Sequence, residues 1–92
     1  MKEKILLPYT ENIAVGGGEM FARPNIADEG PSVIYVWRYA NDNVYSICIG
    51  YDVVGITCNT AKEAMDTLDK ILIDDGYKLI THDEVDKYLV ML

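Results

Sequence analysis

Two dense runs of β-forming residues that lead straight into a capped helix constrain this fold more than any other feature of the chain. Val, Ile, Tyr, Trp and Thr crowd residues 32–40 and 44–58, and Asn41-Asp42-Asn43 separates the two runs. Such residues favour strands, whereas Asn and Asp favour turns. The pattern therefore predicts a hairpin over residues 32–50, followed by a third strand over 53–58.

The turn also predicts the register of this hairpin. If residues 41–43 form the loop, Ala40 lies opposite Val44 and the odd-numbered residues share one face. The odd face then holds Val33, Tyr35, Trp37, Tyr39, Tyr45, Ile47, Ile49 and Tyr51, and the even face holds Ile34, Val36, Arg38, Ala40, Val44, Ser46, Cys48 and Gly50. Because the even face is mostly small, we expect helices to pack there. The aromatic odd face is then either core beneath another segment or an interface.

The segment after the third strand is predicted to be a helix over about residues 60–75. Thr60 is an N-cap candidate, and Glu63 completes a capping box three residues later. Apolar residues follow at helical spacing in one stripe: Ala61, Ala64, Met65, Leu68, Ile71 and Leu72. Gly76 supplies the left-handed residue that commonly ends a helix, and Tyr77 is placed to fold back on the last turn.

The same signals predict a second helix over about residues 82–91. Thr81 and Glu84 make another capping box, and the apolar stripe consists of Val85, Tyr88, Leu89 and Leu92. With the hairpin and third strand, the two helices predict an α+β fold. We expect a three- or four-stranded, mainly antiparallel sheet with both helices packed on one face.

The N-terminal third of the chain is less regular. Residues 3–7 can form a short strand that Pro8 stops. Residues 9–31 contain Gly16-Gly17-Gly18 and are predicted to form a flexible loop, in which Met20-Phe21-Ala22 can pair briefly as a strand. A chain of 92 residues is expected to form a single domain.

The charge of the chain excludes some classes of partner. It carries 15 Asp and Glu against 8 Lys and Arg, which gives a net charge of −7 and a pI near 4.4. Phosphates and anionic lipids repel such a chain, so we expect no direct binding to nucleic acid or membranes. No stretch resembles a signal peptide or a membrane span, which predicts a cytoplasmic protein.

Few residues carry reactive chemistry. Cys48 and Cys58 lie in strand-like sequence without a CxxC spacing, so we expect two buried free thiols. His82 is the only histidine, and the sequence identifies no partner for it, which favours a surface position. The sequence contains no zinc-ligand spacing, calcium loop or phosphate-binding glycine motif. We therefore expect no cofactor, no metal and no enzymatic activity.

The remaining candidate residues are suited to binding. Carboxylates recur along the predicted helices, and the binding candidates among them are Asp66, Asp69, Asp74, Asp75, Asp83 and Asp86. Trp37 and Tyr39 are the aromatic candidates, since such residues anchor interfaces. The main hypothesis is a non-enzymatic acidic protein that binds a basic protein surface, in its sharpest form a phage-type inhibitor that occupies a nucleic-acid-binding groove. The same carboxylates can instead serve only solubility.

A resemblance of topology accompanies this hypothesis. The order hairpin, third strand and Thr60-x-Lys62-Glu63-Ala64 helix resembles the sheet-then-helix plan of small phage and mobile-element proteins, including integrase arm-binding domains. Those domains read DNA with basic strands, whereas the strands here carry one arginine and no lysine. The resemblance therefore implies topology alone. The alternative hypothesis is a regulatory or peptide-binding module that acts through a sheet edge or the aromatic sheet face, or a homodimer that buries that face.

Overall fold

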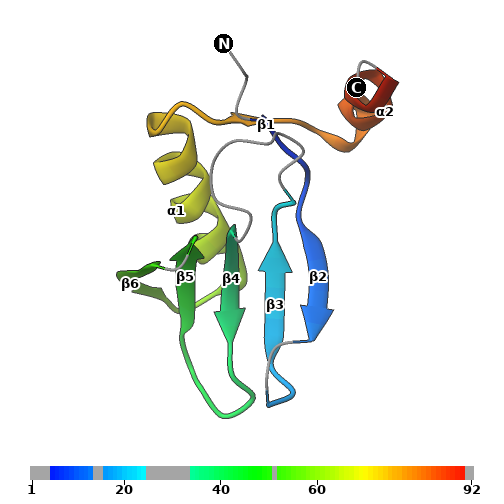
Figure 1. Ribbon diagram of the computed structural model, residues 1–92. Helices are drawn as coiled ribbons and strands as arrows, with labels where there is room; N and C mark the ends of the chain where they lie inside the picture. The colour runs from blue at the N-terminus through cyan, green and yellow to red at the C-terminus, as the bar shows by residue number, and fades with distance from the viewer. Residues whose placement is uncertain (1–4, 14–15, 25–33, 51, 91–92) are drawn as a thin grey trace.

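The computed structural model describes residues 5–13, 16–24, 34–50 and 52–90, which form an α+β fold (Figure 1). The elements are β1 (Ile5–Leu6), β2 (Thr10–Ile13), β3 (Glu19–Ala22), β4 (Ile34–Arg38), β5 (Tyr45–Ile49), β6 (Asp52–Cys58), α1 (Ala61–Asp74), β7 (Lys78–Leu79) and α2 (His82–Val90). Strands β2 to β6 make an antiparallel sheet in sequence order, and β1 pairs with β7 in a separate parallel sheet. The predicted fold class is confirmed, but the main sheet has five strands rather than three or four.

The additional strands lie in the segment that was predicted to be a loop. Within residues 9–31, β2 and β3 form a hairpin, so the loop prediction is wrong for residues 10–13 and for Glu19. The brief strand expected at Met20-Phe21-Ala22 is confirmed. Residues 14, 15 and 25–31 of that segment lie outside the described part of the chain.

The three glycines make the β2–β3 turn. Gly16 and Gly17 have φ angles of 82° and 84°, in the region that L side chains rarely adopt. Gly18 is required for a different reason, because a Cβ at this position would lie 1.7 Å from the carbonyl oxygen of Arg38. The turn thus depends on both the backbone freedom and the small size of glycine.

The N-terminal strand is shorter than predicted and pairs elsewhere. Within the predicted span 3–7, β1 covers Ile5–Leu6, and residues 3 and 4 lie outside the described part. Ile5 lies opposite Lys78 and Leu6 opposite Leu79, so this strand joins β7 rather than the main sheet. The backbone N–H of Ile80 donates to the Leu6 carbonyl at 3.2 Å and extends the contact.

The predicted register of the β4–β5 hairpin is wrong by one residue. Trp37 lies opposite Ser46, so the strands pair one residue away from the predicted alignment. The connection is longer than the predicted loop, and Arg38 stabilises it. Its Nη1 donates to the carbonyls of Tyr39, Ala40 and Asp42 at 3.1, 3.3 and 3.2 Å.

This shift mixes the two predicted faces. Ile34 and Val36 come from the face predicted to be small, yet they share one side of the sheet with Tyr45 and Ile47 from the predicted aromatic face. These four residues are buried. The expectation that a helix covers an intact even-numbered face is therefore wrong.

Strand β6 confirms the predicted third strand and carries a bulge near Gly55. Tyr45 lies opposite Cys58 and Ile47 opposite Val54, so the register changes between Ser46 and Ile47. The chain between Val54 and Thr57 therefore bulges out of the ladder.

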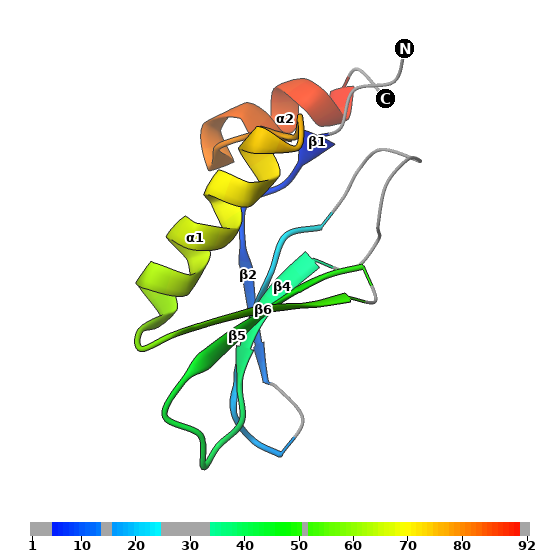
Figure 2. The ribbon, with the colours of Figure 1, turned by 90° about the vertical axis from the view of Figure 1, so that its left-hand side faces the viewer.

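Helix α1 covers the mixed face of the sheet (Figure 2). The predicted stripe is confirmed, because Ala64, Leu68 and Leu72 are buried, with Ala61 and Met65 partly buried against the same cluster. The opposing sheet contributes Ile34, Val36, Tyr45, Ile47 and Cys58, and Leu6 and Tyr77 complete the cluster. This apolar core is the main source of stability for the described fold.

Both ends of α1 agree with the sequence signals. The Thr60 Oγ1 accepts a hydrogen bond from the Glu63 N–H at 3.1 Å. At the other end, the Tyr77 N–H donates to Leu72 O at 2.9 Å and the Gly76 N–H to Ile73 O at 3.1 Å, with Gly76 at φ 92°. This is a Schellman motif.

Helix α2 forms where predicted but does not pack on the main sheet. The Glu84 carboxylate accepts hydrogen bonds from the backbone N–H and the hydroxyl of Thr81, both at 3.1 Å. Figures 1 and 2 place α2 at the end of the molecule where β1 lies, away from the five-stranded sheet. The expectation that both helices cover one sheet face is therefore correct for α1 and wrong for α2. The pairing of β7 with β1 directs the chain to that end before α2 begins.

Candidate functional site

The side of the five-stranded sheet opposite α1 is not covered by any described helix (Figure 2). Directly opposed residues of an antiparallel ladder share a face, so the register assigns this side residue by residue. We call it the open face, and its residues are Thr10, Asn12, Met20, Ala22, Tyr35, Trp37, Ser46, Cys48, Val53 and Thr57, with Tyr39 beyond the end of β4.

The strands β2 to β6 place their charges on the other side of the sheet. Their charged residues are Glu11, Glu19, Arg38 and Asp52. The pairing between strands places each of these four side chains on the same side of the sheet as Val36. The open face as defined above therefore has no charged side chain, and its polar strand residues, Thr10, Asn12, Ser46 and Thr57, are neutral.

Two of these charges pair with each other beside the core. Arg38 Nη2 donates to Glu19 Oε1 at 2.9 Å, and the Tyr45 hydroxyl donates to the same oxygen at 3.2 Å. The hydrogen bond from Arg38 is the main reason that the pKa of Glu19 lies below its ordinary value. The pair holds β3, β4 and β5 together on the α1 side.

Aromatic rings run along β4, the central strand, on the open face. The ring centroids of Tyr35 and Trp37 lie 5.3 Å apart at 55°, and those of Trp37 and Tyr39 lie 6.5 Å apart at 82°. Tyr39 is 47% exposed, and Val53 on β6 is 64% exposed. The pKa of Tyr35 is raised above its ordinary value, mainly by burial and to a smaller extent by a hydrogen bond with Cys48. Tyr35 and Trp37 are half-buried and Cys48 is buried, so the aromatic row is only partly exposed.

The structure separates the predicted acidic candidates from the predicted aromatic ones. Trp37 and Tyr39 belong to the open face, whereas all six carboxylates lie on or at the ends of α1 and α2. Asp66 pairs with Lys62 at 2.8 Å on the exposed side of α1. Asp74 and Asp75 are exposed at the C-terminal end of α1, and Asp83 and Asp86 are exposed on α2. The predicted site therefore falls on two different surfaces.

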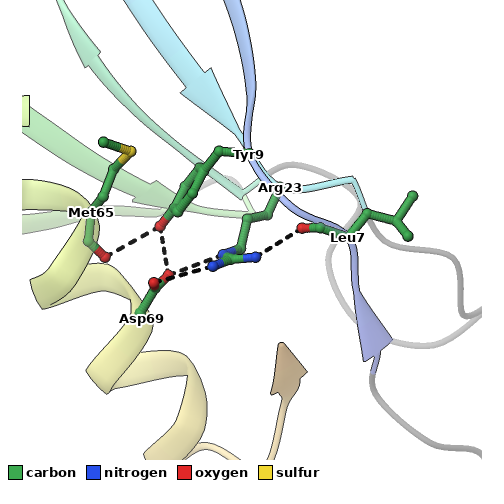
Figure 3. A network of polar contacts seen from close by, with 5 residues as sticks. All are labelled: Leu7, Tyr9, Arg23, Met65 and Asp69. Atoms are coloured by element: carbon green, nitrogen blue, oxygen red, sulfur yellow. Dashed lines mark hydrogen bonds and ion pairs between the residues drawn. The ribbon is translucent and has the colours of Figure 1, made fainter. Parts of the chain in front are cut away.

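Asp69 is engaged in a polar network that sequence reasoning missed (Figure 3). Its Oδ1 accepts from Arg23 Nε at 3.0 Å and from the Tyr9 hydroxyl at 2.6 Å, and its Oδ2 accepts from Arg23 Nη2 at 3.1 Å. Arg23 Nη1 donates to the Leu7 carbonyl at 2.9 Å, and the guanidinium lies 4.2 Å from the centre of the Tyr9 ring. The Tyr9 hydroxyl also lies 3.2 Å from the Met65 carbonyl oxygen. We call this the Arg23–Asp69 network.

Electrostatics and burial identify the Arg23–Asp69 network as structural. Arg23 is only 9% exposed, and it is the one buried charged residue in the described ranges. Burial alone would lower the pKa of Arg23, but the hydrogen bonds and charge of Asp69 raise it above its ordinary value. Burial, aided by the bond to Asp69, also raises the pKa of Tyr9. The network joins the segments flanking β2 and β3 to α1, with its polar groups paired.

The reactive residues of the described chain form no catalytic cluster. Cys48 and Cys58 are buried free thiols, as predicted, and they lie on opposite sides of the sheet. His82 is exposed at the start of α2. Within the described ranges, no group of three His, Cys, Asp or Glu residues is arranged to hold a metal ion, and no helix is long and apolar enough to cross a membrane.

Comparisons of the chain with protein-family models, with curated proteins and with solved structures give no match.

Proposed function

We propose that this chain is a non-enzymatic protein-interaction module that binds its partner through the open face. The observation that carries the proposal is the combination of a sheet face that no described helix covers, a row of three aromatic rings and the absence of charge at its described strand positions. Tyr39 and Val53 are exposed on this face beside the half-buried Tyr35 and Trp37, and an apolar patch that reaches the surface among polar residues is a common mark of an interaction surface.

The aromatic row suits an interface for energetic reasons. Tyr and Trp are favoured in interfaces because they supply large contact areas with few rotatable bonds, and their polar tips accept exposure to water in the free state. Trp37 occupies the middle of the row, between Tyr35 and Tyr39. Binding residues at the centre of a patch contribute most, because surrounding contacts exclude water from them. We therefore assign Trp37 as the principal anchor.

The test is an affinity capture from a lysate of the organism that encodes the chain. The wild-type protein and the variants Trp37→Ser and Ile73→Ser are each used as bait. Ile73 is a matched control, since it is a large hydrophobic residue, 58% exposed, on α1 rather than on the open face. We expect wild type and Ile73→Ser to retain the same protein at high salt, and Trp37→Ser to lose it, because an uncharged contact is barely screened. Equal capture by Trp37→Ser would refute the proposal.

A second candidate rests on the acidic helix ends. Asp74, Asp83 and Asp86 are exposed, and residues 60–90 hold eight acidic and four basic residues. A protein with a basic surface would bind there by charge, with fast association that weakens as salt rises. In the same capture experiment, this candidate requires release at moderate salt and loss with the triple variant Asp74→Asn, Asp83→Asn and Asp86→Asn. Trp37→Ser should leave that binding unchanged.

A further inference from the structure

We propose that the partner of the open face is a second copy of this chain, packed face to face about a two-fold axis. This inference rests on the proposed function and names the partner of the same surface. In a two-fold dimer each residue of the patch meets the equivalent patch on the other copy, so the patch must be complementary to itself.

The distribution of charge allows the open face to meet a second copy of itself without like-charge repulsion. Like charges placed opposite one another in an interface oppose binding, and a charged patch meets its own sign when it pairs with a second copy. The open face avoids this conflict, because Glu11, Glu19, Arg38 and Asp52 all align with the α1 side of the sheet. Thr10, Asn12, Ser46 and Thr57 provide neutral hydrogen-bonding groups around the aromatic row.

The net charge of −7 does not oppose this arrangement strongly. Packed sheets lie about 10 Å apart, and face-to-face packing would place the two α1 helices on the outer sides of both sheets. The carboxylates of α1 would then be separated by both sheets, well beyond the Debye length of about 8 Å at physiological ionic strength. Repulsion between the two copies is therefore largely screened.

The available area predicts a reversible dimer. Five strands about 4.8 Å apart and about five residues long present a flat face of roughly 24 by 16 Å, or about 400 Å². Two such faces would bury roughly 800 Å² in total, which is below the standard range for specific interfaces and typical of weak, transient ones. The dimer should therefore depend on concentration rather than being obligate.

The β6 edge of the sheet is less suited to self-association. Strand β6 is an edge strand with Val53 and Ile56 exposed, and an exposed edge can pair with another strand. However, the bulge between Val54 and Thr57 interrupts the ladder that a second strand would have to follow. The geometry thus favours packing through the face over pairing through the β6 edge.

The test is sedimentation equilibrium of the purified, untagged chain from micromolar to near-millimolar concentration. We expect the mass to rise from 10.3 kDa toward twice that value. Association should be unchanged or stronger at about 0.5 M NaCl than at about 0.05 M, because salt screens only the repulsion between acidic chains. Trp37→Ser should weaken it by tenfold or more, whereas Ile73→Ser on α1 and Ile56→Lys on the β6 edge should not.

Tyr39→Ser gives a second test of the face if Trp37→Ser disturbs folding, because Tyr39 is exposed and lies beyond the end of β4. It should also weaken the dimer. A dimer lost with Ile56→Lys but retained with both aromatic variants would overturn face-to-face packing, as would a dimer dissociated by salt. A chain that stays monomeric overturns the inference. If Trp37-dependent capture of another protein persists in that case, the proposed function remains intact, and if it does not, both are overturned.

Discussion

Replacement of Asp69 by Asn should destabilise the protein strongly, because it leaves Arg23 buried without its counter-charge. Arg23 is 9% exposed and makes two charge-assisted hydrogen bonds to Asp69, at 3.0 and 3.1 Å. Each such bond contributes about 1.5–3 kcal/mol, and the partial exposure of Asp69, 27%, reduces that value. Asn keeps one side-chain oxygen that can accept from the Tyr9 hydroxyl. Its NH2 group replaces the other carboxylate oxygen, however, and is a donor where Arg23 needs an acceptor. We therefore expect a loss of about 2–4 kcal/mol in the free energy of unfolding.

The assay is urea unfolding followed by far-UV circular dichroism, supported by a thermal scan. For 92 residues, a loss of this size corresponds to a fall of about 10–20 °C in Tm. Asp66→Asn is the matched control, since it removes a carboxylate from the same helix whose partner, Lys62, is exposed. Exposed pairs of this kind add little to stability, so the control should unfold at the same midpoint as wild type.

A further variant tests the reason for the loss rather than its size. Arg23→Met combined with Asp69→Asn removes the unpaired positive charge while keeping an apolar side chain of similar length. The double variant should recover part of the stability lost by Asp69→Asn alone. If it is no more stable than that single variant, or if Asp69→Asn behaves like Asp66→Asn, the buried-charge reasoning is refuted.

Three other predictions concern folding. Thr60→Ala should lower the free energy of unfolding by about 1 kcal/mol, because the Glu63 N–H loses its acceptor; an unchanged urea midpoint would contradict this. Gly18→Ala should lower it by about 1–3 kcal/mol, while Gly55→Ala, with nothing within 4 Å, should unfold like wild type. Stability should fall as pH rises above about 10, because the folded state raises the pKa of Tyr9 and keeps the proton that the unfolded chain loses. Tyr9→Phe should flatten this alkaline slope in urea titrations from pH 8 upward, and an unchanged slope would exclude Tyr9 as its source.

The residues of α1 show how much the sequence alone determined. Thr60 accepts a bond from Glu63 three positions away, and Gly76 ends the helix within one turn of Leu72. The buried stripe follows from the helical repeat. These signals act between residues a few positions apart, so they can be interpreted without knowing what the helix packs against.

The sheet shows what local signals leave open. Residues 32–58 were correctly predicted to contain three strands, but several registers satisfy the same β-forming residues. In the observed register, Glu19 on β3 accepts hydrogen bonds from both Arg38 on β4 and Tyr45 on β5, which lie 19 and 26 positions away. The strands of the glycine-rich segment were missed because they gain stability from pairing with β4. No local sequence pattern reveals that long-range pairing, so the segment was predicted to be a loop.

The candidate site depends even more on tertiary structure. The sequence identified Trp37 and Tyr39 as binding candidates but placed them with carboxylates that the fold holds on the helices. Asp69 was predicted to bind a partner, whereas the fold pairs it with Arg23, 46 positions away. A helix or strand follows from interactions over a few residues. Which face stays uncovered, and which charges are neutralised, is decided only when distant segments meet and their burial energies are compared.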